Sequence, residues 1–171
     1  MKTLRTLITG TACAALCALT FTAWAADSIT PRNFIDEASA KGIAEIETAK
    51  LALDKATSAD IKSFAQQMID DHTAANQALA KLAADQALEV ADDAELVSKA
   101  KAMILQLRDG ESFDRAYANN QVVAHEQTIE LFREAVSSED AQVSAFAKET
   151  LPKLEHHLQM AKDLVAITHA N

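Results

Sequence analysis

Residues that break helices are almost absent from most of this chain, and this absence restricts its fold more than any other feature. After residue 26, the 171-residue chain contains only two glycines and two prolines: Gly42, Gly110, Pro31 and Pro152. Alanine, leucine, glutamate, lysine and glutamine, which favour helix, dominate the same stretch. No segment alternates apolar and polar residues as a strand would. The chain is therefore predicted to be all-α.

Capping residues divide this helical stretch into four long segments and one short one. Thr30 precedes Pro31, which suits a first helical turn, and the first helix should run to about residue 56. Residues 57–60, Thr-Ser-Ala-Asp, have the pattern of a capping box and open a second helix to about residue 86. A short helix is predicted over residues 92–109, a long one over 112–136, and a last one from the capping residues 137–140 to about 167.

An internal repeat indicates how these helices pair. Residues 44–48, Ala-Glu-Ile-Glu-Thr, parallel residues 124–128, Ala-His-Glu-Gln-Thr, and residues 61–65 parallel 143–147 after a two-residue insertion. The alternative is chance similarity between alanine-rich helices. A true repeat predicts a four-helix up-down bundle of two related hairpins, with the short helix in the crossover, which is a ferritin-like arrangement.

The first 25 residues have the features of a secretory signal peptide. Lys2 and Arg5 precede an uncharged, mostly apolar stretch over residues 6–23, and Ala23-Trp24-Ala25 matches the small-x-small cleavage pattern. We therefore expect residues 1–25 to be cleaved, residues 26–171 to form a single domain in the periplasm, and no transmembrane span to remain. The alternative is an uncleaved membrane anchor.

Cleavage would change the chemistry of the chain. Both cysteines, Cys13 and Cys17, would leave with the signal peptide, so the remaining chain would have no disulfide and no thiolate ligand. Lys2 and Arg5 would leave too, so that 14 basic residues face 25 acidic ones, for a net charge of −11. Such a charge argues against binding to nucleic acid or anionic lipid.

Four ionisable residues lie on the apolar stripes of four different helices: Glu45, His72, His125 and His157. Buried polar groups need partners, so four of them in four core stripes suggest a shared site. If the turns near residues 57 and 138 share one end of the bundle, the four residues lie within about 8 Å along its axis. Three histidines and one carboxylate suit one zinc ion, or one copper ion given the nearby Met68 and Met160. The alternative is that each histidine is a core residue bonded to a carbonyl or a carboxylate.

Di-iron chemistry is not expected. Di-iron carboxylate sites in bundles need Glu-x-x-His pairs, but Ile69 and Leu154 occupy the positions three residues before His72 and His157. The other acidic pairs, including Asp70-Asp71, are interpreted as helix starts or exposed faces. No phosphate-binding loop or nucleophile elbow is present, and an enzyme is the third choice.

The order of these motifs resembles an exported bacterial family, domain of unknown function 4142. The resemblance covers nearly the whole chain after the signal peptide, and it implies a ferritin-like bundle in the envelope with Glu45, His72, His125 and His157 at family positions. It implies no activity. The segments that carry it are Ala44-Glu45-Ile46, Phe64-Ala65, Asp71-His72-Thr73-Ala74-Ala75-Asn76, Phe113-Asp114-Arg115-Ala116-Tyr117, His125-Glu126, Leu131-Phe132 and Leu151-Pro152-x-Leu154-x-x-His157-Leu158.

Two functions remain open from the sequence. The first is a periplasmic bundle whose axial His and Glu cluster binds one zinc or copper ion. The second is a structural or interaction module, such as an envelope stress adaptor or chaperone, that binds no metal.

Overall fold

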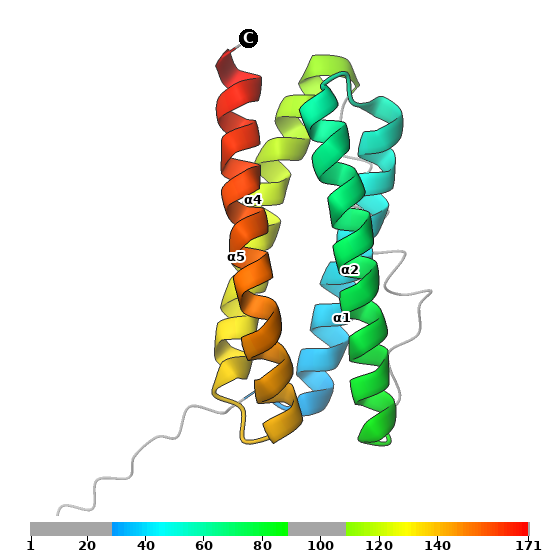
Figure 1. Ribbon diagram of the computed structural model, residues 1–171, viewed down its shortest axis with the longest axis vertical. Helices are drawn as coiled ribbons and strands as arrows, with labels where there is room; N and C mark the ends of the chain where they lie inside the picture. Colours follow the sequence, from blue (N-terminus) through cyan, green and yellow to red (C-terminus); the bar gives the residue numbers. More distant parts are fainter. Residues whose placement is uncertain (1–28, 89–108, 171) are drawn as a thin grey trace, which may run out of the picture.

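The computed structural model describes residues 29–88 and 109–170, and within these ranges the chain forms four helices and no strands. The helices are α1 (Pro31–Lys55), α2 (Ala59–Asp85), α4 (Gly110–Val136) and α5 (Ala141–Ala170). The predicted all-α four-helix bundle is confirmed (Figure 1). Both the signal segment and the short helix predicted over residues 92–109 fall essentially outside the described residues.

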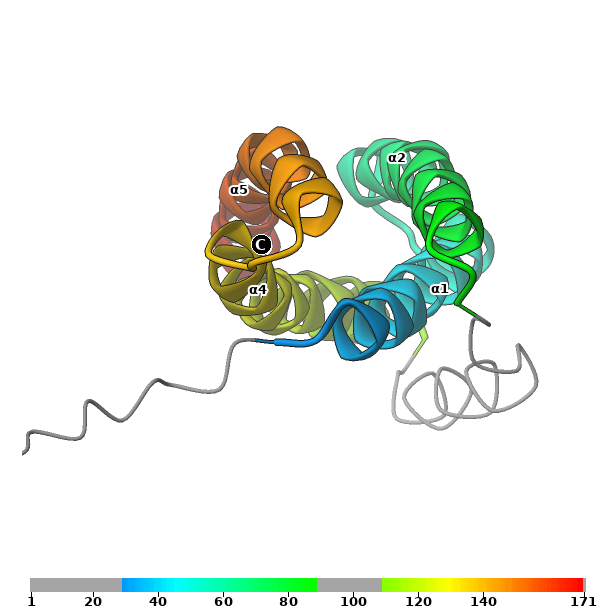
Figure 2. The same ribbon diagram turned by 90° about the horizontal axis from the view of Figure 1, so that it is seen from below.

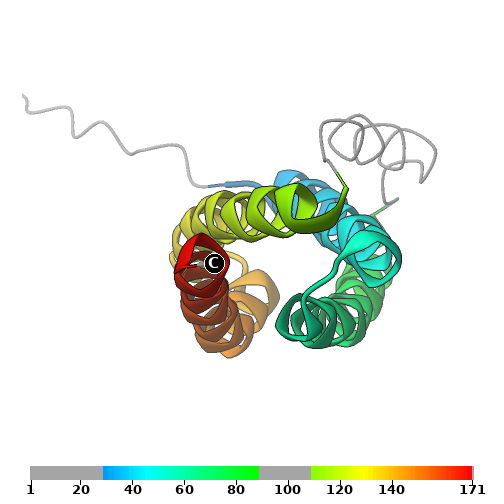
Figure 3. The same ribbon diagram turned by 90° about the horizontal axis from the view of Figure 1, so that it is seen from above.

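The helices form two hairpins that pack side by side. α1 pairs with α2 and α4 pairs with α5, while α1 also packs against α4. Views along the bundle show α2 and α5 facing each other across the remaining side, where the helices touch least (Figures 2 and 3). Each helix runs antiparallel to the helices beside it, while α2 and α4 run in the same direction, so the order along the chain is up, down, down, up (Figure 1).

The two hairpin turns lie at opposite ends of the bundle, so the expectation that they share one end was wrong (Figure 1). The start of α1 packs with the end of α2, the end of α4 and the start of α5, as Phe34, Leu82, Phe132 and Val143 show. The reason is that the chain crosses from one end of the bundle to the other between α2 and α4: α2 finishes at the end that holds the α4–α5 turn, and α4 begins at the end that holds the α1–α2 turn.

Local capping follows the sequence with one shift. The Thr30 hydroxyl accepts a hydrogen bond from the Asn33 amide at 3.2 Å, as predicted for the start of α1. α2 is capped by Ser58 and not by Thr57, because the Ser58 hydroxyl accepts from the Ile61 amide. α5 is capped by Asp140, whose carboxylate accepts from two amides of the first turn at 2.9 Å.

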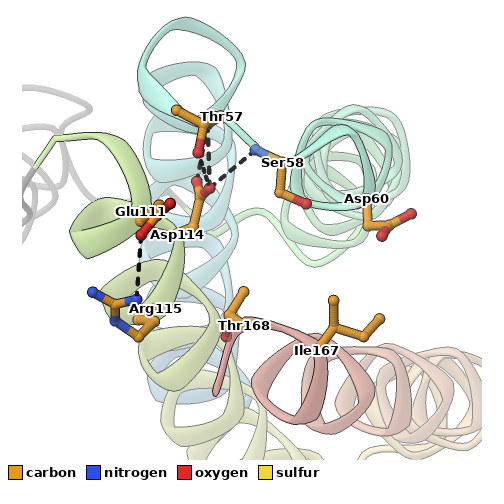
Figure 4. A pocket seen from close by; sticks show the side chains of 8 residues that line it. All are labelled: Thr57, Ser58, Asp60, Glu111, Asp114, Arg115, Ile167 and Thr168. Atoms are coloured by element: carbon orange, nitrogen blue, oxygen red, sulfur yellow. Dashed lines mark hydrogen bonds and ion pairs between the residues drawn. The ribbon is translucent and has the colours of Figure 1, made fainter. Parts of the chain in front are cut away.

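Asp114 explains why Thr57 is not the cap. This buried carboxylate on α4 accepts hydrogen bonds from the Thr57 amide at 3.2 Å, the Thr57 hydroxyl at 2.5 Å and the Ser58 amide at 2.9 Å (Figure 4). These bonds fasten the α1–α2 turn to the second hairpin. Figure 4 also shows Glu111 and Arg115 on the outer side of the same surface pocket, where they form an ion pair at 3.9 Å.

Two apolar clusters fill the two ends of the bundle. One gathers at the α4–α5 turn around Phe34, Leu79, Phe132 and Leu154. The other gathers at the α1–α2 turn around aromatic and aliphatic residues that include Phe64, Met68, Phe113 and Tyr117. The three buried histidines lie between these two clusters, since each is flanked along its helix by a residue of one cluster on one side and of the other cluster on the other side. None of the helices in the described ranges is long and apolar enough to cross a membrane.

Candidate metal centre

Three histidines from three helices meet inside the bundle. His72 lies on α2, His125 on α4 and His157 on α5, and their exposed fractions are 6%, 1% and 1%. Their ring centroids are 5.5 to 5.7 Å apart, which makes a nearly equilateral triangle. One ring nitrogen of each histidine lies within 4.8 Å of the other two. The sequence placed all three on interior stripes, and the structure brings them together.

The histidines share a level because each lies near the middle of its helix. His72 is 13 residues after Ala59, His125 is 15 after Gly110, and His157 is 13 before Ala170, and these three helix ends lie at the same end of the bundle. At about 1.5 Å per residue, the three levels differ by only about 3 Å. The three histidines therefore cluster although the assumption about the turns was wrong. A residue near the middle of a helix lies at about the same height in the bundle whichever end is used for counting.

Two of the rings are oriented by hydrogen bonds to oxygen acceptors. His125 Nδ1 lies 2.9 Å from the carbonyl oxygen of Gln121, and His157 Nε2 lies 2.9 Å from a carboxylate oxygen of Asp71. A carbonyl or carboxylate oxygen can only accept, so each of these nitrogens carries the proton. In a neutral imidazole the other nitrogen then has a free lone pair, which is the arrangement found in histidines that bind metal.

The nitrogens left over are buried and have no hydrogen-bond partner. They are His125 Nε2 and His157 Nδ1, together with Nε2 of His72. Three buried nitrogens without a partner among the described residues are costly, because a buried polar group without a partner loses about 1–3 kcal/mol. A metal ion that accepts all three lone pairs would remove this cost.

His72 and His157 are neutral at physiological pH. Burial, followed by the nearby His125, lowers the pKa of His72 to about 3. Burial likewise lowers the pKa of His157 to about 4, although its hydrogen bond to Asp71 opposes the shift. Neutral imidazole is the form that binds metal, so these two residues need lose no proton first.

Glu45 is buried beside the three histidines but is not one of the mutually close set. Its exposed fraction is 5%, and the group of nitrogens within 4.8 Å of one another does not include its carboxyl. Burial raises the pKa of Glu45, while His125, Gln121 and Lys41 act to lower it. The carboxyl is therefore close enough to His125 for their charges to interact, and its Oε2 atom has no hydrogen-bond partner.

Asp71 is the important residue that the sequence analysis missed. It was interpreted as part of an exposed face, but its carboxylate bridges His157 and Lys153, with the Lys153 ammonium at 2.7 Å. Partial burial raises the pKa of Asp71, but the hydrogen bonds from Lys153 and His157 outweigh it and leave that pKa lowered. The available signal was an acidic residue next to one core histidine and a lysine one turn before another.

Tyr117 and Gln121 were also missed as polar residues of this region. Tyr117 was expected to be core packing, and its ring does stack with Phe113, but its hydroxyl is buried without a partner. Both side-chain polar atoms of Gln121 are buried without a hydrogen bond of ordinary geometry. Met68 and Met160, considered for copper, pack with the apolar cluster at the α1–α2 turn.

Comparison with known proteins identifies the family of this chain but assigns it no activity. The chain is a four-helix bundle with a buried histidine triad, and it belongs to the family described as domain of unknown function (DUF4142), whose profile matches residues 18–164. This confirms the resemblance to that family. No curated protein and no solved structure matches the chain, so the narrower description of the bundle as ferritin-like stays a prediction.

Proposed function

We propose that this protein is exported to the periplasm and there binds one zinc or copper ion with His72, His125 and His157, beside the acid of Glu45. The single observation that carries the proposal is the convergence of His72, His125 and His157 from three helices, with one ring nitrogen of each within 4.8 Å of the other two. Each ring also has a buried nitrogen without a hydrogen-bond partner among the described residues. Binding of a metal ion, and not a reaction, is the function assigned.

The chemistry of the donors supports this choice of metal. Neutral imidazole nitrogens suit zinc and copper, whereas magnesium and calcium prefer oxygen ligands. A tetrahedral ion with nitrogens at about 2.0–2.1 Å places those nitrogens about 3.3 Å apart. The histidine nitrogens already lie within 4.8 Å of one another, so each pair needs to approach by about 1.5 Å at most.

Orientation of the rings supports it further. Asp71 holds the proton of His157 on Nε2, and the Gln121 carbonyl holds that of His125 on Nδ1. Carboxylate and carbonyl partners of this kind fix the tautomer and raise the basicity of a metal-binding histidine. Lys153 in turn fixes the Asp71 carboxylate.

The test is metal analysis of protein purified without a histidine tag, before and after equilibration with zinc or copper. We expect one ion per chain and, at a free metal concentration about 100 times the Kd, an increase of about 2.7 kcal/mol in the free energy of unfolding. His72→Ala and His125→Ala should abolish stoichiometric binding. His156→Ala is the matched control, because His156 is the exposed neighbour of His157.

Absence of bound metal at micromolar free zinc and copper would overturn the metal proposal and favour the structural or interaction module. Export is tested separately by cell fractionation and by the N-terminal sequence of the purified protein, which should begin at Ala26. A chain that retains residues 1–25 in the membrane fraction would instead be anchored.

A further inference from the structure

We propose that the fourth coordination position of this ion is filled by an oxygen ligand from solvent, water or hydroxide, which Tyr117, Gln121 and Glu45 hold and which small anions can replace. This inference rests on the proposed metal function. In this arrangement Glu45 binds the solvent ligand of the ion and does not itself coordinate the ion.

The first argument is that these three side chains have buried polar atoms without partners. The atoms are the Tyr117 hydroxyl, both amide atoms of Gln121 and Oε2 of Glu45, and the residues are 0%, 0% and 5% exposed. Buried polar groups in folded proteins are nearly always hydrogen-bonded, to protein or to bound water. A hydrogen bond from Gln121 helps to lower the pKa of Glu45, so these two side chains lie within reach of each other. The Tyr117 hydroxyl and the remaining amide atom of Gln121 still have no partner among the described residues, and they can bind a ligand from solvent.

Other buried polar residues of the same helices do not share this need. The Thr48 hydroxyl donates to the Ala44 carbonyl at 2.8 Å, and the Thr128 hydroxyl donates to the Ala124 carbonyl at 2.8 Å. Both threonines are satisfied within their own helices. The unpaired atoms are thus confined to particular residues and are not a general property of the polar interior.

The second argument is that Gln121 and Glu45 lie next to His125, and that Tyr117 lies one helical turn beyond Gln121. Tyr117, Gln121 and His125 follow one another at four-residue intervals on α4, which places them on one face of the helix. Glu45 interacts electrostatically with Tyr117 and with His125, the first and last residues of this row. After burial, Glu45 is the second cause that raises the pKa of Tyr117, and His125 acts to lower the pKa of Glu45. Glu45 on α1 therefore faces the row on α4.

The third argument is the coordination chemistry. Three histidines leave a tetrahedral ion one ligand short, and sites with three protein ligands keep an open position for water or substrate. Three neutral imidazoles also leave a divalent ion uncompensated in a region of low dielectric, which favours an anionic ligand. A phenol donor and an amide that both donates and accepts can bind the oxygen of such a ligand.

The experiment uses the full mature protein loaded with Co²⁺, whose visible absorption bands report the ligands of a tetrahedral site, and azide as the probe anion. We expect one Co²⁺ per chain and a saturable change of the bands as azide replaces the solvent ligand. Tyr117→Phe and Gln121→Leu should each change the apparent Kd for azide by about tenfold or more while one Co²⁺ still binds. Thr128→Val is the matched control, because it also removes one buried hydroxyl, and it should leave the azide titration unchanged.

The possible results separate the two proposals. Co²⁺ bands that azide does not alter, but that change in Glu45→Gln, would show Glu45 as a direct ligand and overturn this inference while the metal function stands. Bands that respond to azide equally in wild type, Tyr117→Phe and Gln121→Leu would also overturn it. Failure of the wild type to bind Co²⁺, zinc or copper would overturn the metal function itself.

Discussion

At the scale of single residues, Gly42 shows how the small side chains of α1 are used. Small residues lie around Glu45 on the buried face of α1, among them Gly42 and Ala49, and they leave room for a neighbouring helix. At Gly42 this room is taken by Asn76 of α2, because a Cβ atom at Gly42 would lie 2.1 Å from Asn76 Oδ1. The Asn76 amide nitrogen also donates to the Ser39 carbonyl at 3.4 Å. Gly42 therefore makes room for the Asn76 side chain between α1 and α2.

The clash predicts opposite effects of one substitution in two backgrounds. Gly42→Ala should lower the free energy of unfolding of the wild type by about 1–3 kcal/mol, the usual cost of overpacking a core. In an Asn76→Ala background the same change should be neutral or should stabilise by up to about 1 kcal/mol, because alanine favours helix. Urea unfolding of the four proteins measures both values. Equal effects in the two backgrounds would mean that Asn76 is not what excludes a side chain at position 42.

Asp71 is the other residue whose effect can be isolated. Asp71→Asn should weaken zinc or copper binding by about 10–100-fold, since the amide is a poorer acceptor for the His157 N–H and no longer pairs with Lys153. Asp70→Asn is the control, because Asp70 is exposed and accepts only from Gln66 within the same helix among the hydrogen bonds found. Competition titration against a chromophoric chelator measures the affinity. Equal affinities for both variants would remove Asp71 from the site.

At the scale of elements, some helix ends are decided partly by another helix. The start of α2 is the clearest case, since Asp114 of α4 binds Thr57 and thereby leaves Ser58 to cap the helix. One carboxylate thus holds the turn between α1 and α2 and joins it to α4 (Figure 4). A turn that is held from outside in this way should contribute to the stability of the whole bundle.

Removal of this carboxylate should therefore be costly. Asp114→Ala leaves the Thr57 and Ser58 donors without their acceptor, and we expect the free energy of unfolding to fall by about 2–4 kcal/mol. Asp60→Ala, in the exposed first turn of α2, should cost less than about 1 kcal/mol, the range of a helix-dipole interaction. Thermal or urea unfolding compares the two variants. A loss for Asp114→Ala no larger than that for Asp60→Ala would contradict the proposed role of the link.

At the scale of the whole molecule, the buried ionisable groups tie stability to pH. His72 and His157 stay neutral in the folded chain at pH values where unfolded histidine, with a pKa of 6.5, takes up a proton. The unfolded state then binds more protons than the folded state. Acid therefore favours unfolding, starting at about pH 6.5 and continuing until the folded pKa values of about 4 and 3 are reached.

The expected loss for the metal-free protein is roughly 1.4 kcal/mol per pH unit for each of these histidines. Glu45 acts in the opposite direction, because burial raises its pKa and the folded state then keeps a proton above pH 4.5. Asp71 adds to the loss only below its unfolded pKa of 3.8. Urea unfolding between pH 7 and pH 4 should show the decline, and His72→Leu and His157→Leu should each flatten it. An unchanged slope in both variants would assign the acid sensitivity to other groups.

The helices and the residues that face inward could be predicted from the amino-acid sequence. Thr30, Pro31 and the lack of other breakers set the first helix, because capping and backbone hydrogen bonding act between residues close in sequence. The apolar stripes likewise placed Glu45 and the three histidines inside, since each side of a helix is fixed by its own 3.6-residue period. These features depend on local geometry alone.

Only the tertiary structure decided how those residues meet. The periodicity of single helices does not say at which end a hairpin turns, so the turns near residues 57 and 138 were misplaced relative to each other. Nor does it give the rotation and axial shift of one helix against the next, which bring Asp71 to His157 and leave Glu45 outside the closest set. Packing between helices fixes both quantities, and they determine which histidine nitrogens are left free for a metal ion.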